Sequence, residues 1–138
     1  MFKGMKLFAL IIVFLGLWNV SFAQLEVTIK GIKNDKGNIR VGVFSDEKTF
    51  LKHAAFGKVV KATQDQLTID LPPGKYAISV IHDENENGEL DSNFIGIPKE
   101  GFGFANDAMG NFGPPSFEKA SITVETGKRT ITITLRYL

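Results

Sequence analysis

The chain has no cysteine, and this absence excludes several kinds of site. Without thiols there is no disulfide framework, zinc thiolate centre or thiol nucleophile. Only two histidines are present, His53 and His82, so an imidazole acid or base has few candidates. Tryptophan occurs once, as Trp18 in the N-terminal apolar run, and this weakens the case for a sugar-binding surface.

The N-terminus has the pattern of a cleaved secretory signal. Lys3 and Lys6 precede an apolar run over residues 7–18, and the small residues Ser21 and Ala23 mark a cleavage site. The run is short for a bilayer-spanning helix, although an uncleaved anchor is the alternative. We therefore predict a signal at residues 1–23 and one domain at residues 24–138, exported to the periplasm or the extracellular space.

Charge gives no sign of a polyanionic partner. Loss of Lys3 and Lys6 with the signal changes the formal charge from +1 to −1, which argues against binding to nucleic acid or to an anionic membrane. The remaining chain of about 115 residues is the size of one domain. We expect a monomer with no membrane span after cleavage, whose partner is an unknown extracytoplasmic protein or glycan.

Short segments of the mature chain alternate apolar and polar residues, which is typical of half-buried strands. The pattern predicts about seven strands, near residues 25–30, 39–44, 59–62, 67–71, 76–81, 122–124 and 131–135. The first two are expected to form a hairpin through the turn at 34–38, and the last two through residues 125–128.

One segment changes period. Phe50, Leu51, Ala54 and Ala55 recur at helical spacing behind Ser45 or Asp46 as an N-cap, which predicts one short helix between residues 45 and 56. Many short strands with one helix and no alternation of strand and helix predict an all-β, antiparallel β-sandwich, Ig-like or transthyretin-like.

The acidic stretch that follows the strand at 76–81 has the spacing of a calcium loop. Oxygen-bearing side chains stand at alternate positions around Gly88, and a hard divalent cation needs six to eight such oxygens. The expected ligands within the stretch are Asp83, Asn85, Asn87, the Glu89 carbonyl and Asp91. Position twelve of a helical calcium hand would be Phe94, so the closing acidic ligand must come from elsewhere.

A metal-free polar turn is the alternative interpretation of this stretch. Asn87 and Gly88 also form a strong two-residue hairpin turn. The metal is favoured because Glu84, Glu86 and Glu89 add further negative charge, and no Lys or Arg occurs between Lys75 and Lys99 to balance it.

A long segment, residues 92–116, fits neither period and is rich in Gly, Asn, Pro and Phe. Its aromatic content predicts a lid that caps one end of the sandwich core. Glu100, Asn106 or Asp107 could swing back to complete the calcium shell. Glu100 is preferred, because Pro98 and Gly101 define a turn around it.

Catalysis has little support in the sequence, and no catalytic residue is assigned. His53 is expected to be a surface or packing residue, while His82 could orient a carboxylate or bind a transition metal. Asp83 and Asp91 could act as the acid pair of a glycosidase, but both fall in one short turn. The alternative function is a glycan-processing hydrolase or carbohydrate-binding protein that uses residues 83–107.

Four segments carry resemblances to known families. Leu71-Pro72-Pro73-Gly74-Lys75-Tyr76 resembles the hallmark of transthyretin-like and Cna-B-like sandwich modules. Residues 82–91, 96–106 and 113–117 together resemble a small exported bacterial family known as domain of unknown function 2141. The resemblance covers nearly all of the mature chain and implies a β-sandwich in an exported protein, with no activity attached.

The acidic stretch by itself is similar to calcium loops in SdrD-like B domains, where the ion braces a sandwich module. This similarity implies a structural ion. Together these observations predict a secreted, non-catalytic module with a structural calcium site, acting as a binding or cell-envelope accessory protein.

Overall fold

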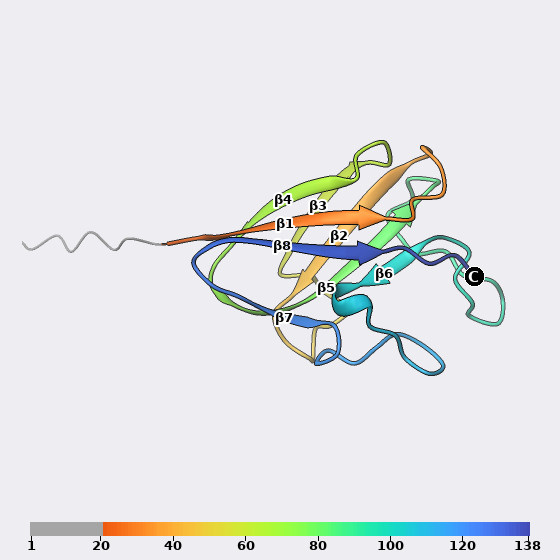
Figure 1. Ribbon diagram of the computed structural model, residues 1–138. Coiled ribbons are helices and arrows are strands. Elements are labelled where there is room, and N and C mark those ends of the chain that lie inside the picture. The colour runs from red at the N-terminus through yellow and green to blue at the C-terminus, as the bar shows by residue number, and fades with distance from the viewer. Residues whose placement is uncertain (1–20) are drawn as a thin grey trace, which may run out of the picture.

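Eight strands in two facing sheets make up residues 21–138, the part of the chain that the computed structural model describes (Figure 1). The strands are β1 (Ala23–Lys30), β2 (Asn38–Phe44), β3 (Phe56–Lys61), β4 (Gln66–Leu71), β5 (Gly74–Asp83), β6 (Phe102–Phe104), β7 (Ser121–Val124) and β8 (Gly127–Thr134). A single turn of 3-10 helix, η1 (Ala105–Asp107), follows β6. The β-sandwich predicted from the alternation is thereby confirmed.

The smaller sheet has the order β4-β1-β8. β1 pairs antiparallel with β4 and parallel with β8, so that Ala23 lies opposite both Leu71 and Gly127. Figure 1 shows β1 and β8 side by side through the middle of the molecule. The sandwich is therefore antiparallel except for this one pair.

The larger sheet has the order β3-β2-β5-β6, and β7 also pairs with β5. All of its pairings are antiparallel. β5 is long enough to pair along one edge with two short strands, first β7 and then β6. Its last residue, Asp83, therefore lies at one end of the sandwich, next to Asn38 of β2.

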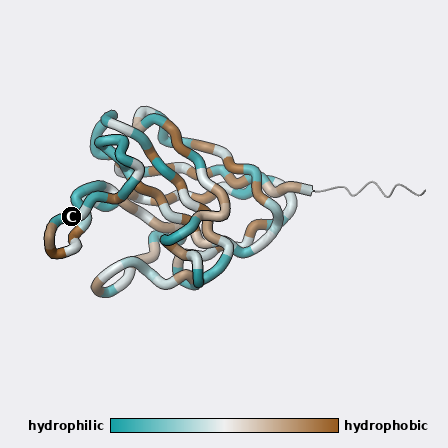
Figure 2. Tube along the Cα trace, turned by 180° about the vertical axis from the view of Figure 1, so that it is seen from behind, coloured by the Kyte–Doolittle hydropathy of each residue, from teal (hydrophilic) through white to brown (hydrophobic). Residues whose placement is uncertain are grey.

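The main core lies between the sheets and follows the period of two. Leu25, Val27 and Ile29 of β1 are buried, while the residues between them are at least partly exposed. The facing side of the larger sheet contributes apolar residues such as Ile39 and Val80, both fully buried. Figure 2 shows this alternation as brown and pale segments along the strands. Burial of this apolar surface provides most of the driving force for the fold.

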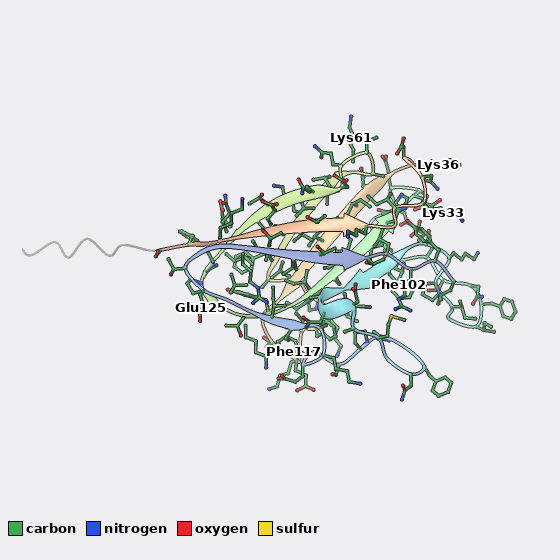
Figure 3. All side chains as sticks on the ribbon, viewed as in Figure 1. Lys33, Lys36, Lys61, Phe102, Phe117 and Glu125 are labelled. Atoms are coloured by element: carbon green, nitrogen blue, oxygen red, sulfur yellow. The ribbon has the colours of Figure 1, made fainter. Side chains whose placement is uncertain are left out.

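A second apolar cluster covers the other face of the larger sheet. Its buried members are Phe44, Ala77, Phe102, Phe104, Phe117 and Ala120. Figure 3 labels Phe102 on β6 and Phe117 on the segment before β7. The aromatic residues of the long segment thus pack inward as predicted. They cover a sheet face, however, and do not cap one end of the main core. Phe94 and Phe112 are fully exposed.

Both predicted hairpins are wrong. β1 pairs with β4 and β8, and β2 pairs with β3 and β5, so the first two strands belong to different sheets. The last two strands also separate, since β7 pairs with β5 and β8 with β1. Each connection crosses from one sheet to the other, and the strands on both sides of it bury their apolar side chains in the shared core. The long segment also contains β6 and η1, where no regular structure was expected.

The short helix predicted between residues 45 and 56 is absent. The segment is a series of turns, in which Leu51 has a positive φ of 60° that an α-helix does not allow. The Asp46 carboxylate accepts the Thr49 N–H at 2.8 Å, and this bond lowers the pKa of Asp46. Phe50 then packs edge-on against Phe44, with ring centroids 5.4 Å apart. Packing of one aromatic ring therefore explains Phe50, whereas Leu51, Ala54 and Ala55 are exposed and form no buried helical face.

The predicted signal, residues 1–23, lies outside the described residues except for its last three. Ala23, the residue before the predicted cleavage point, is fully buried as the first residue of β1. Among residues 21–138 no helix is long and apolar enough to cross a membrane.

Candidate functional site

Three separate segments meet at the end of the sandwich where β5 finishes. They are the turn after β1, the acidic loop after β5, and the C-terminal residues after β8. Figure 3 shows Lys33 and Lys36 of the first segment at this end and Glu125 at the opposite end. His82, fully buried, contacts two of these segments, because its ring nitrogens lie 2.7 Å from the Tyr137 hydroxyl and 2.7 Å from the Lys36 carbonyl.

Asp83 starts the acidic loop and holds its first turn. The side chain is fully buried, and its two oxygens accept the N–H groups of Asn87, at 3.1 Å, and Gly88, at 2.8 Å. The chain bends through two positive-φ residues, Glu86 at 57° and Gly88 at 81°. This bend brings the later residues of the loop back over Asp83.

Asp91 is the second carboxylate of the loop, and two amides point at it. The side chain of Asn85 donates to one oxygen at 2.5 Å, and that of Asn87 donates to the other at 2.6 Å. The bond from Asn87 and then the bond from Asn85 lower the pKa of Asp91. The amide groups thus supply partial positive charge at the centre of the loop.

Glu100 reaches the loop from the segment before β6. Its side chain is only 5% exposed, and one oxygen accepts the Asp91 N–H at 3.2 Å. Burial raises the pKa of Glu100, and the nearby charges of Asp91 and Asp83 raise it further. Glu100 therefore places a buried carboxyl group at the acidic loop, within reach of the charges of Asp91 and Asp83.

Residues 91–100 form a narrow hairpin, and its first and last residues, Asp91 and Glu100, form its base. Ser92 and Pro98 form a β-bridge, and the Asn93 side chain accepts the N–H groups of Ile95, at 3.0 Å, and Ile97, at 2.9 Å. The hairpin tip carries Phe94, which is fully exposed, and Ile95, which is 65% exposed. Figure 2 shows the tip as a brown stretch beside the C-terminus.

The structure brings all six predicted ligand residues into one hydrogen-bonded network, five of them through their side chains: Asp83, Asn85, Asn87, Asp91 and Glu100. The sixth, Glu89, has an exposed side chain, and its N–H donates to Asn87 at 3.0 Å. In residues 21–138 no three acidic, histidine or cysteine side chains gather closely enough to hold a metal by themselves. The network combines three carboxylates with two amides.

The two other candidates for the closing ligand lie elsewhere. Asn106 donates to the carbonyls of Lys119 and Ser121, and Asp107 accepts the Thr134 N–H at 3.0 Å. Both side chains therefore fix the segment after β6 against β7 and β8. Of the three candidates, only Glu100 contacts the acidic loop.

Sequence reasoning did not find Arg40. Its guanidinium lies 3.7 Å from Asp83, although the two residues are far apart in the sequence and on different strands. Knowledge that β2 neighbours β5 is needed to pair them. The part played by Tyr137 beside His82 was missed for the same reason.

Comparison with known proteins gives one match. The family model described as "Uncharacterized protein conserved in bacteria (DUF2141)" matches residues 27–132, as the resemblance predicted. No curated protein matches the chain, and no solved structure does so either.

Proposed function

Because the chain belongs to this bacterial family, whose description names no activity, we propose a function from its own site. The chain is a non-catalytic β-sandwich module that binds one structural calcium ion in the loop after β5. The ligands are the side chains of Asp83, Asn85, Asn87 and Asp91, the carbonyl of Glu89, and the side chain of Glu100.

The observation that supports this proposal is the burial of Glu100, whose carboxyl group accepts the Asp91 N–H and whose pKa is raised by burial and by the charges of Asp91 and Asp83. A buried anion beside like charges is costly, and a bound cation removes that cost. Calcium prefers carboxylate, amide and carbonyl oxygens in a flexible shell. The oxygen atoms that this loop offers to a metal are all of these three types.

Two amides give the loop a way to exchange its hydrogen bonds for a metal. Asn85 and Asn87 donate N–H groups to Asp91, and an amide presents its oxygen in place of its NH₂ group after a half-turn. With calcium, the same side chains become ligands. The ion would then fasten the end of β5 to the base of the 91–100 hairpin, which is a structural role.

Location and partners complete the proposal. The signal pattern at residues 1–23 supports an exported protein. Because the chain lacks cysteine, an exported domain of this kind relies on its core and an ion for stability. We place the module in the periplasm or outside the cell, as a monomeric binding or envelope accessory protein. Its partner would be an extracytoplasmic protein or glycan.

A hydrolase is the competing function, and the site gives it less support. Asp83 uses both carboxylate oxygens to hold backbone N–H groups, whereas a catalytic acid or base must reach a substrate. A groove of about 330 Å³ on the outer face of the larger sheet is lined in part by Arg40, Phe44 and Ile81, and none of its lining residues is acidic.

Thermal unfolding with calcium and then with excess chelator tests the proposal. Calcium at a hundredfold over its dissociation constant stabilises a fold by about 2.7 kcal/mol, which corresponds to a rise in melting temperature of about ten degrees for a domain of this size. Asp91→Asn should lose most of this rise. Asp70→Asn, the same change at an exposed position of β4, should keep the rise.

The choice of variant matters, because Asp83→Ala would also remove two bonds of the metal-free loop. No calcium-dependent rise in the wild-type protein would overturn the calcium site. Calcium-dependent turnover of a glycan in a substrate screen would favour the hydrolase instead.

A further inference from the structure

Arg40 extends from the middle of β2 across the larger sheet to the acidic loop. Its register partner on β5 is Ile81, two residues before Asp83, so Arg40 and Asp83 point to the same face. The guanidinium Nη1 lies 3.7 Å from Asp83 Oδ2. The guanidinium also lies against the loop turn, since a Cβ added to Gly88 would be 3.7 Å from Nη2.

This contact is an ion pair without a good hydrogen bond. A separation of 3.7 Å is too long for an N–H···O bond, and Asp83 Oδ2 already accepts the Gly88 N–H at 2.8 Å. Loss of Arg40 would therefore leave the loop turn with its own bonds. The contribution of Arg40 to the loop is its charge.

That charge lies next to a carboxylate that the proposed calcium ion also needs. Asp83 is fully buried, whereas the Arg40 side chain is 36% exposed. The guanidinium can therefore move into solvent when a stronger cation arrives, while Asp83 stays in place. Two cations beside one buried carboxylate repel each other.

We infer that Arg40 is a built-in counterion that competes with the metal and lowers the affinity of the loop for it. This inference rests on the proposed calcium site and adds its regulation. In the empty protein the guanidinium partly balances Asp83, and a bound ion pays an electrostatic penalty for its presence. Removal of the charge should therefore tighten binding.

The expected size follows from Coulomb's law. One positive charge about 6 Å from a divalent ion in a water-like medium weakens the binding of that ion roughly tenfold. The binding of a trivalent ion at the same place is weakened roughly thirtyfold. The effect of Arg40 should thus grow with the charge of the bound ion, which a purely structural role would not produce.

The test is isothermal titration of the purified chain with calcium and with terbium at low ionic strength, where screening is weak. The variants are Arg40→Gln, which removes the charge, and Arg40→Lys, which keeps it. Arg129→Gln is the matched control, because it makes the same change on β8, in the exposed strand start that pairs with β1 near Ala23.

The inference predicts that Arg40→Gln lowers the calcium dissociation constant about tenfold and the terbium constant about thirtyfold, with Arg40→Lys and Arg129→Gln near wild type. Equal or weaker calcium binding by Arg40→Gln, with a wild type that binds, would overturn the inference alone. No calcium binding by the wild type or by any variant would overturn the proposed function as well.

Discussion

The hydroxyl of Tyr137 lies 2.7 Å from Nδ1 of His82 and completes a chain of hydrogen bonds around this buried imidazole. The Lys36 carbonyl can only accept, so His82 Nε2 carries the ring proton and Nδ1 accepts from the Tyr137 O–H. The Tyr137 oxygen in turn accepts the Lys33 N–H at 3.0 Å. Every polar group in this chain is satisfied, and the C-terminus is held against the start of the acidic loop.

We expect Tyr137→Phe to destabilise the protein, because it leaves Nδ1 of the buried His82 without a partner. An unsatisfied buried group costs about 1–3 kcal/mol, which urea denaturation would measure. The matched control is Tyr76→Phe, where the lost hydroxyl donates only to the Pro72 carbonyl at 2.6 Å. An equal loss in the free energy of unfolding in the two variants would show that the hydrogen bonds around His82 stabilise the fold no more than the single bond of Tyr76.

We expect Glu100→Gln to have effects of opposite sign without and with calcium. The pKa of Glu100 is raised above its ordinary value of 4.5, mainly by burial. A raised pKa means that the carboxyl group favours the fold when protonated. Its contribution is complete below pH 4.5 and is lost as the pH rises through the raised value. In chelator at neutral pH, Gln removes this loss and should raise the melting temperature.

In saturating calcium the same substitution removes a ligand, and the variant should melt below the wild type. Melting curves between about pH 4 and pH 8, a range that begins near the ordinary pKa of a carboxyl group, would record the rise in chelator and the fall in calcium. Asp91 has the opposite effect on stability, because the amides of Asn87 and Asn85 lower its pKa. Its contribution is present above its ordinary pKa and is lost as the pH falls through the lowered value. A Glu100→Gln variant less stable than wild type in chelator at neutral pH would contradict this account of the buried carboxyl group.

Two phenylalanines of the long segment should respond very differently to the same substitution. Phe104 is 6% exposed and packs near Phe50, with ring centroids 6.5 Å apart. Phe104→Ala should cost about 3–5 kcal/mol through the cavity it leaves. Phe94→Ala, at a fully exposed position, should change the free energy of unfolding by less than about 0.5 kcal/mol. A large loss at Phe94 in chemical denaturation would show that the hairpin tip is packed in solution.

Gly37→Ala and Gly96→Ala form a second matched pair. Both glycines have positive φ, at 68° and 85°, but a Cβ on Gly37 would lie 2.1 Å from the Asp83 carbonyl, whereas nothing lies within 4 Å of one on Gly96. Gly96→Ala should cost about 1–2 kcal/mol from backbone strain. Gly37→Ala should cost more and should also reduce the calcium-dependent rise in melting temperature, because it displaces Asp83. Equal costs would mean that the turn moves aside freely.

Alternation predicted where every strand except β6 lies, but it could not predict how the strands pair. The pattern of Leu25, Val27 and Ile29 marks a buried face, and that face is the same whether β1 pairs with β2 or with β8. Pairing is decided by contacts across the core, which no local window contains. The segment at 45–56 shows the converse, since its apolar residues have helical spacing, yet Phe50 packs on the Phe44 ring and Leu51 is exposed with a positive φ.

The candidate site was predictable as far as its residues share one loop. Ligand spacing identified Asp83, Asn85, Asn87 and Asp91, and turn residues identified Glu100 as the group that returns to the loop. Groups on other strands left no local signal. Arg40, for example, is an ordinary polar residue of an alternating strand until β2 is placed beside β5.

The parallel pairing of β1 with β8 joins the first strand of the described chain to the last. Without β8, β1 has only β4 as a neighbour, and a two-stranded ribbon is marginally stable in water. Closure of such a long loop must come before the pair forms, and this slows folding. The smaller sheet therefore cannot be completed before residues 127–134 have been synthesised, and β1 waits for its second neighbour longer than any other strand of this sheet.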